Sequence, residues 1–429
     1  MDNRKKHKIR KTNARLFSIY KMLSFDLLFY YPIEFLFCTL TKGISVSQVL
    51  YVSSIYLIAK IITQSPVVHG ASRLGNSKTI VLGNCMLILS ILLLIIVPGM
   101  LGVVIANIIM AFAFNFKTMT EEALLFETVA TRGGSGLFSK INSKGSSFHY
   151  LLDGVTALTS GYLFVFNNYL PMYICLGFIV LATLLSLGFR DLSEPVKKRV
   201  RYKTNIFVTI RKRLHTNKDY YKKVLRSNRL RSFIFFNLIF YSFIMLTNTY
   251  LKAVFLNMGV SEEQFALVLA IATLFTGLSL FFCRKIEKKL RNKTLTVLSL
   301  TYVILSIALG VAAMFTKAKW VISLAVVVIS VLFFIKAMWY TIKFKYLMNF
   351  TENKERNPIT FVNESISSIG ASITSFVGGL TLEHLDVNKA MAYSSIIFLV
   401  LTIVAIIYMR DRFGLKPSKY SKKDIRLGF

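Results

Sequence analysis

The stretch TIVLGNCMLILSILLLIIVPGMLGVVIANIIMAFAFNF, residues 79–116, decides the fold class, because it contains no Asp, Glu, Lys or Arg. An α-helix needs about 20 apolar residues to cross the ~30 Å hydrocarbon core of a bilayer. Pro98 and Gly99 divide the stretch into two segments of suitable length. Further uncharged stretches lie at 154–189, 294–316 and 390–409. The chain is therefore predicted to be an all-α membrane protein that crosses the bilayer many times.

The composition agrees with a membrane protein. Hydrophobic residues make up 54% of the 429 residues and charged residues 17%, whereas a soluble domain carries about 25% charged residues. Lys and Arg number 53 against 20 Asp and Glu, a formal net charge of +33. Such an excess can indicate nucleic-acid binding, but here the basic residues lie in short loops between apolar segments. Membrane topology and attraction to anionic lipid explain them more simply, so we expect no nucleic-acid partner.

Dividing the apolar runs at charges and turn residues predicts twelve transmembrane helices. The first six lie at 17–40, 47–69, 79–97, 100–121, 147–166 and 170–190, and the last six at 232–256, 263–283, 294–315, 320–346, 358–382 and 389–409. With both termini in the cytoplasm, inner segments hold 46 Lys and Arg and outer loops hold 5, as the positive-inside rule requires. We expect a multi-pass protein of the plasma membrane.

The spans group into two six-helix halves. The predicted organisation is a basic cytoplasmic amino terminus (1–16), a first bundle (17–190), a basic cytoplasmic linker (191–231), a second bundle (232–409) and a basic cytoplasmic tail (410–429). In the linker, Ile206, Phe207, Ile210 and Leu214 follow helical spacing. They indicate either an amphipathic helix on the membrane surface or a solvated linker. The fifth span of each half carries a carboxylate, Asp153 or Glu364, followed by small residues, which suggests a duplicated architecture.

The loop after the second span reads Gln64-Ser65-Pro66-Val67-Val68-His69-Gly70-Ala71-Ser72-Arg73-Leu74-Gly75-Asn76-Ser77-Lys78. With the twelve-span layout, it makes the chain resemble the major facilitator superfamily over residues 15–412, and the runs at 29–33 and 42–45 look like a Gram-positive branch. The family pattern there is Gly-x-x-x-Asp-Arg/Lys-x-Gly-Arg/Lys-Arg/Lys. Arg73 and Gly75 match it, but Ser72 stands where the family has its aspartate. The resemblance implies a cytoplasmic gate at Ser72, Arg73 and Gly75. Asp153 and Glu364 lie ~9 Å from the inner surface by their helical positions, so they are interpreted either as structural residues of the gate region or as proton sites.

Ionisable residues inside spans are functional candidates, because each costs about 2.5–3.5 kcal/mol near the bilayer centre. At ~1.5 Å of rise per helical residue, Asp26 and Lys60 lie ~14–15 Å from the inner ends of their spans, and Lys336 lies at a similar depth. Asp26 is therefore predicted to pair with Lys60 or with Lys336. Such a pair either couples transport to protons or is a static ion pair that fixes helix packing.

Asp26, Tyr30 and Glu34 have the spacing i, i+4, i+8 and are predicted to share one face of the first helix, which Pro32 can kink. The resemblance implies that this face looks into a central cavity, with Asn107, Asn248 and Lys336 on other lining helices. Two further expectations concern the cytoplasmic side. Glu121, Glu122 and Glu127 are expected to be solvated, and His149 is either a structural side chain or a proton relay to Asp153.

These features predict a secondary transporter that works by alternating access. The expected activity is gradient-driven export of a small amphipathic, cationic or peptide-like compound, and the expected partners are that substrate, protons or another coupling ion, and anionic lipid at the basic loops. We expect a monomer, no cofactor, no metal and no enzymatic activity, since no catalytic motif is visible. Two alternatives remain: a non-transporting receptor or assembly protein on the same scaffold, and a lipid-modifying membrane enzyme.

Overall fold

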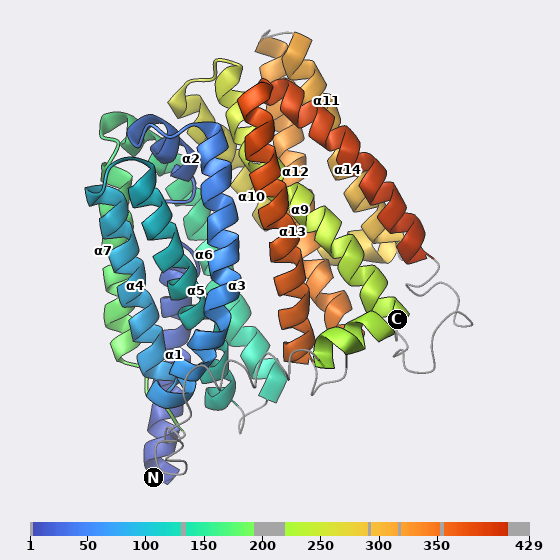
Figure 1. Cartoon of the computed structure of the whole chain (residues 1–429). Helices are drawn as coiled ribbons and strands as arrows, with labels where there is room; N and C mark the ends of the chain where they lie inside the picture. Colours follow the sequence, from blue (N-terminus) through green and yellow to red (C-terminus); the bar gives the residue numbers. More distant parts are fainter. Residues whose placement is uncertain are drawn as a thin grey trace. The chain divides into compact units, whose positions relative to one another are not determined.

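The computed structural model describes residues 3–129, 134–192, 219–290, 293–315, 319–351 and 356–410. Within these ranges the chain is helical and contains no β-strand (Figure 1). The first elements are α1 (Asn3–Ser24), α2 (Glu34–Leu36), the π-helical turn η1 (Phe37–Thr41), α3 (Val46–Leu74), α4 (Asn76–Ile96), α5 (Gly99–Val129), α6 (Gly134–Phe166) and α7 (Leu170–Leu187). The later ones are α9 (Asn228–Asn257), α10 (Glu262–Leu290), α11 (Thr294–Phe315), α12 (Lys319–Asn349), α13 (Arg356–His384) and α14 (Val387–Arg410).

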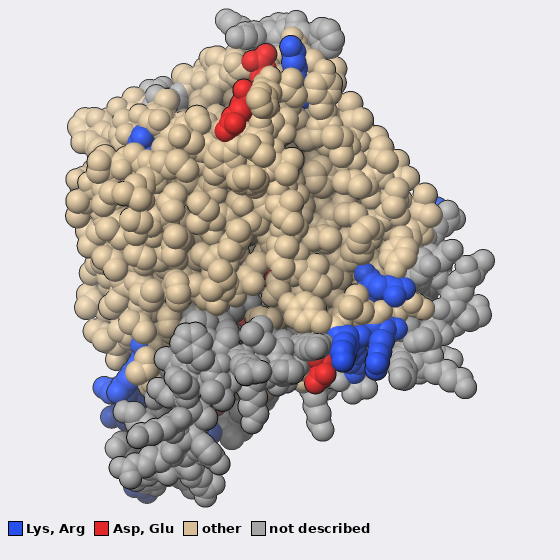
Figure 2. Space-filling view, viewed as in Figure 1, with Lys and Arg blue, Asp and Glu red and all other residues tan. Residues whose placement is uncertain are grey.

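Nine helices of the described ranges are long and apolar enough to cross a membrane: α3, α4, α5, α7, α9, α11, α12, α13 and α14. They coincide with nine of the twelve predicted spans. The predicted spans at 147–166 and 263–283 correspond to α6 and α10, and α10 offers a shorter apolar segment, Leu267–Ser279. The all-α membrane fold is thus confirmed, while the count of twelve stays a prediction. On the face shown in Figure 2, a wide area of the described surface carries no Lys, Arg, Asp or Glu side chain.

The chain divides into two compact units. The first unit comprises Met1–Ile44 and Ala59–Ile210, and the second comprises Ser45–Ile58 and Arg211–Phe429. The start of α3 is therefore grouped with the second unit, where Ser54 and Ser372 of α13 share a hydrogen bond of 2.7 Å. The amphipathic helix predicted at 206–214 and most of the tail at 410–429 lie outside the described residues.

The first unit is built on the close approach of α4 and α5. A Cβ atom at Gly83 would lie 3.0 Å from the carbonyl oxygen of Ala113 on α5. Ser90 of α4 also donates a hydrogen bond of 2.8 Å to the carbonyl oxygen of Ala106. Small residues let transmembrane backbones approach and gain van der Waals contact. The pairs α1–α6 and α4–α7 complete the packing of this unit.

The second unit is built around α9. In the most apolar segment of this helix, 78% of the residues are buried. An aromatic cluster holds α9 against α12, with Phe240 and Trp339 rings 4.8 Å apart at an interplanar angle of 84°. A polar contact joins α9 to α13, because Asn237 donates to Asn363 at 2.9 Å and to Ser367 at 2.8 Å. Edge-to-face aromatic pairs and hydrogen bonds between helices both stabilise a membrane bundle.

The first predicted span, 17–40, is interrupted, and this corrects the expectation of a single kinked helix. The helix α1 ends at Ser24 and regular structure resumes only at Glu34. Between them, Phe29 has a φ of 67°, the one positive φ of a non-glycine residue in the described chain. Leu27, Leu28, Phe29 and Tyr30 are all buried, so the irregular backbone lies inside protein, as a membrane environment requires.

Candidate functional site

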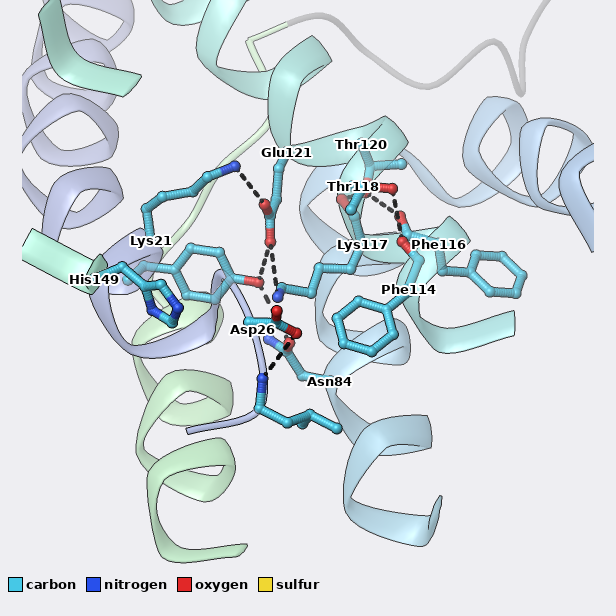
Figure 3. A network of polar contacts seen from close by, with 12 residues as sticks. Lys21, Asp26, Asn84, Phe114, Phe116, Lys117, Thr118, Thr120, Glu121 and His149 are labelled. Carbon is cyan, nitrogen blue, oxygen red and sulfur yellow. Dashed lines mark hydrogen bonds and ion pairs between the residues drawn. The ribbon is translucent and has the colours of Figure 1, made fainter. Parts of the chain in front are cut away.

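The candidate site is a group of buried polar side chains in the first unit, which we call the charge cluster: Tyr20 and Lys21 of α1, Asn84 of α4, and Lys117 and Glu121 of α5 (Figure 3). Glu121 lies at its centre. The Tyr20 hydroxyl donates to Glu121 Oε1 at 2.7 Å, Lys21 Nζ lies 3.3 Å from Glu121 Oε2, and Lys117 Nζ lies 3.9 Å from Glu121 Oε1. Asn84 Oδ1 lies 3.3 Å from the Tyr20 hydroxyl.

The cluster is almost entirely shielded from solvent. The side chains of Lys117 and Glu121 are each 1% exposed, and that of Lys21 is 7% exposed. At low dielectric a carboxylate needs a matched cation and hydrogen bonds, and Glu121 has both. Its expected solvated position is therefore wrong, whereas Glu122, one residue on, is exposed as expected.

Helical periodicity could have indicated the burial of Glu121. Leu124, Leu125 and Thr128 follow it at i+3, i+4 and i+7 and are all buried, so the buried face of α5 continues past the predicted end of the span at residue 121. The sequence-based interpretation instead ended the span at the first charges. What the sequence does not show is the set of partners on α1 and α4.

Asp26 lies just after the end of α1, next to the charge cluster. Its carboxylate Oδ1 accepts a hydrogen bond of 3.1 Å from the backbone N–H of Leu27. It interacts electrostatically with Lys117 and Asp153, and Figure 3 shows it directed toward Lys117. The predicted helical face of Asp26, Tyr30 and Glu34 does not exist, because the chain is not helical between residues 25 and 33.

The predicted partner Lys60 of the same unit does not form a salt bridge with Asp26 in the described structure. The depth estimate assumed a continuous first helix, which the structure does not contain. The backbone carbonyl of Lys60 accepts from Asn115 at 2.7 Å. Asn107 is buried and donates to the carbonyl of Val103 in its own helix at 2.9 Å.

His149 of α6 holds the end of α1. Its Nδ1 lies 2.8 Å from the carbonyl oxygen of Met22, one of the carbonyls that a helix leaves without an internal partner at its end. Because a carbonyl only accepts, Nδ1 carries the proton. The ring also packs 5.0 Å from that of Phe25. This geometry supports the structural interpretation of His149.

Gly75 of the loop motif directly precedes α4 and has a φ of 88°. Asp191, which follows α7, accepts from the N–H of Ser77 at 3.0 Å and from its hydroxyl at 2.6 Å. A carboxylate at this position caps the helix and complements its dipole. Ser72 and Arg73 belong to the last turns of α3, and their side chains lie outside the described set.

In the second unit, two lysines of α12 face α9 and α13. Lys336 Nζ donates to Asn248 Oδ1 of α9 at 3.1 Å. Lys343 Nζ lies 2.8 Å from Glu364 Oε1 of α13 and 5.3 Å from the ring centroid of Tyr340. Glu364 therefore pairs with Lys343. Lys336, Tyr340 and Lys343 share one helical face by their spacing.

The described residues contain no group of three or more His, Cys, Asp or Glu side chains that could hold a metal ion. The carboxylates of these clusters can bind and release protons, and their lysines can bind the ionic groups of a ligand.

Sequence comparison places these observations in a family. A model of the Major Facilitator Superfamily matches residues 16–347. The chain belongs to this superfamily. No curated protein sequence matches it.

Solved structures of the superfamily show the same fold. The structure of the nucleoside transporter NupG has a TM-score of 0.68 at 12% identity, with 95% of this chain and 100% of that chain covered. A D-xylose–proton symporter has a TM-score of 0.64 at 14% identity, with 97% and 99% covered. At such low identity the likeness shows the fold alone. This superfamily member is a multi-pass, non-enzymatic secondary transporter, as the sequence predicted.

Proposed function

We propose that the chain is a gradient-driven exporter of a small amphipathic compound, coupled to protons or another ion through Asp26. It would act as a monomer in the plasma membrane with both termini in the cytoplasm. The observation that supports coupling most directly is the interruption of the first span at Asp26, beside the charge cluster.

Irregular backbone at membrane depth is tolerated where it is buried in protein or lines a water-filled cavity. Several transporter folds place substrate and ion sites at such interrupted helices. The charges near this interruption do not balance, since Asp26, Glu34, Glu121 and Asp153 supply four carboxylates and Lys21 and Lys117 supply two ammonium groups. A proton bound by Asp26 removes one of the excess negative charges, and its release restores a negative charge beside Lys117.

The structure changes the argument for the substrate. The expected cationic substrate rested on an acidic face of the first helix, which is absent. In the second unit, the half-buried Lys336 beside Asn248 supplies a cation that suits a carboxylate. Of the predicted classes, a peptide-like compound carries a carboxylate group that suits Lys336.

The proposal is tested by measuring efflux of fluorescent cations and fluorescently labelled dipeptides from cells, with and without a protonophore. Wild type is compared with Asp26→Asn and with the control Asp386→Asn. The control makes the same substitution at an exposed position between α13 and α14. We expect protonophore-sensitive efflux of the dipeptides in wild type and control, and its loss in Asp26→Asn.

The outcomes separate the parts of the proposal. Efflux that persists in the presence of a protonophore would reject proton coupling. Protonophore-sensitive efflux in Asp26→Asn at the wild-type rate would remove Asp26 from the coupling step. If cations leave the cell and dipeptides do not, the peptide-like substrate class is wrong.

A further inference from the structure

An open groove of about 660 Å³ runs between α1 and α6 in the first unit, and no residue of the charge cluster lines it. It is lined on the α1 side by Arg15, Ser18, Ile19 and Met22, and on the α6 side by Lys144 and Phe148, among others. Arg15 and Lys144 are both exposed, and none of the residues that line the groove is acidic. The groove thus combines two positive charges with an apolar wall.

The groove exists because α1 and α6 touch closely at its edge. A Cβ atom at Gly145 would lie 2.7 Å from Cβ of Lys21 and 3.3 Å from the carbonyl oxygen of Ser18. The Ser18 hydroxyl donates to the carbonyl of Ile141 at 3.5 Å. This contact fixes the spacing of the two helices, so that Lys144 and Arg15 line one opening. Lys144 Nζ extends over the ring of Phe148, 6.0 Å from its centroid.

An exposed apolar track leads from the groove along α6. Phe148, Leu151, Val155 and Tyr162 are 47%, 66%, 57% and 57% exposed, and their spacing places them on one helical face with Lys144. From residue 148 to residue 162 this track is ~21 Å long at ~1.5 Å per residue. Half of a ~30 Å hydrocarbon core is ~15 Å, so the track is long enough for one acyl chain.

We propose that the groove between α1 and α6 binds one anionic phospholipid, with its phosphate held by Arg15 and Lys144 and an acyl chain along the exposed face of α6. The charges favour an anion, since two cations line the groove without a carboxylate. The apolar wall and track favour a lipid over free phosphate, which would leave Ile19, Met22 and Phe148 uncovered. The groove also lies where α1 changes from basic residues to apolar ones, as expected at a membrane surface.

The proposal is independent of any transported substrate and is tested by native mass spectrometry of the full-length detergent-purified protein. Dioleoyl-phosphatidylglycerol is titrated in, with dioleoyl-phosphatidylcholine as the neutral lipid. The test variant is Arg15→Gln/Lys144→Gln. The control is Lys11→Gln/Lys78→Gln, which removes two exposed charges from α1 and α4 outside the groove.

We expect one phosphatidylglycerol to bind ahead of all others in wild type and control. A basic residue near anionic lipid contributes about fivefold in affinity, so the double variant should bind about 25-fold more weakly. A second variant, Phe148→Ala, should weaken phosphatidylglycerol binding while leaving both groove charges in place. It keeps the proposal testable if the double variant does not fold.

Three results would overturn the proposal. An equal loss in Lys11→Gln/Lys78→Gln would show diffuse attraction rather than a site. Displacement of phosphatidylglycerol by inorganic phosphate at similar concentrations would identify a free-anion site. Binding of phosphatidylcholine as tightly as phosphatidylglycerol would show that the two cations do not select the headgroup.

Discussion

Lys117 and Glu121 of α5 should respond unequally to removal, although they lie one helical turn apart and are equally buried. Glu121 accepts from Tyr20 at 2.7 Å and faces Lys21 and Lys117 at 3.3 and 3.9 Å. Glu121→Gln therefore leaves Lys21 without its salt-bridge partner and Lys117 with Asp26 alone. Lys117→Met leaves Glu121 with the Tyr20 hydroxyl and Lys21, and it removes an ammonium with no hydrogen-bond acceptor.

The magnitudes follow from burial. Removing one partner from a buried ion pair costs about 3–5 kcal/mol, because the other charge stays buried and uncompensated. Glu121→Gln should lower the unfolding free energy of the first unit by this amount. Lys117→Met replaces a side chain that is 1% exposed by an apolar one of similar length, and because Glu121 keeps Lys21 and the Tyr20 hydroxyl, its cost should be smaller than the about 3–5 kcal/mol of Glu121→Gln.

The assay is the loss of monodisperse protein after heating in detergent, followed by size-exclusion chromatography. For a unit of this size 1 kcal/mol shifts the midpoint by about 2–4 °C, so Glu121→Gln should melt roughly 10 °C lower. Lys117→Met should melt closer to the wild-type temperature than Glu121→Gln does, yet lose protonophore-sensitive efflux because Asp26 loses its cation. Equal melting of the two variants would refute the assignment of Glu121 as the centre of the cluster.

Three further predictions use the same thermal assay. Gly310→Val should destabilise the fold by about 1–3 kcal/mol through overpacking, because a Cβ at residue 310 of α11 would lie 3.0 Å from the backbone of α14. The control Gly277→Val should leave the melting temperature unchanged, because a Cβ there would have no atom within 4 Å. Equal effects of the two substitutions would contradict close packing at α11. Asp191→Ala should cost about 0.5–2 kcal/mol by uncapping α4, and an unchanged midpoint would show that water replaces the cap. Glu364→Leu alone should lower the melting temperature more than Lys343→Leu/Glu364→Leu does, because the double variant also removes the lysine that the single variant leaves without its carboxylate. If the losses of the two single variants add up in the double variant, the 2.8 Å pair is not energetically coupled.

The membrane fold could be predicted from the sequence because its physical cause is local. A run such as 79–116 must be helical and buried in lipid whatever the rest of the chain does. The helices α4 and α5 accordingly begin and end within a few residues of the predicted spans at their outer turn, Pro98 and Gly99. The end of α5 was missed because charges were taken to mark the membrane surface, whereas Lys117 and Glu121 neutralise one another inside the bundle.

The interruption of the first span could not be predicted, because its causes are distant in the sequence. Pro32 suggested a kink, but the helix stops eight residues earlier, at Ser24. There the carbonyl of Met22 binds His149, a residue 127 positions away. Phe29 adopts a positive φ with its ring 5.6 Å from that of Phe178, a buried contact that offsets local strain.

The interruption and the surroundings of Asp26 both depend on α6. That helix supplies His149, which satisfies a terminal carbonyl of α1, and Asp153, which interacts with Asp26. A continuous first helix would satisfy the Met22 carbonyl internally and would carry Asp26 further along the helix axis. The position of Asp26 beside Lys117 is therefore set by where α1 ends, and α1 ends where His149 binds it. A movement of α6 relative to α1 changes the end of α1 and the surroundings of Asp26 together, so the same two helices that form the lipid groove also determine the charge balance at the proposed coupling site.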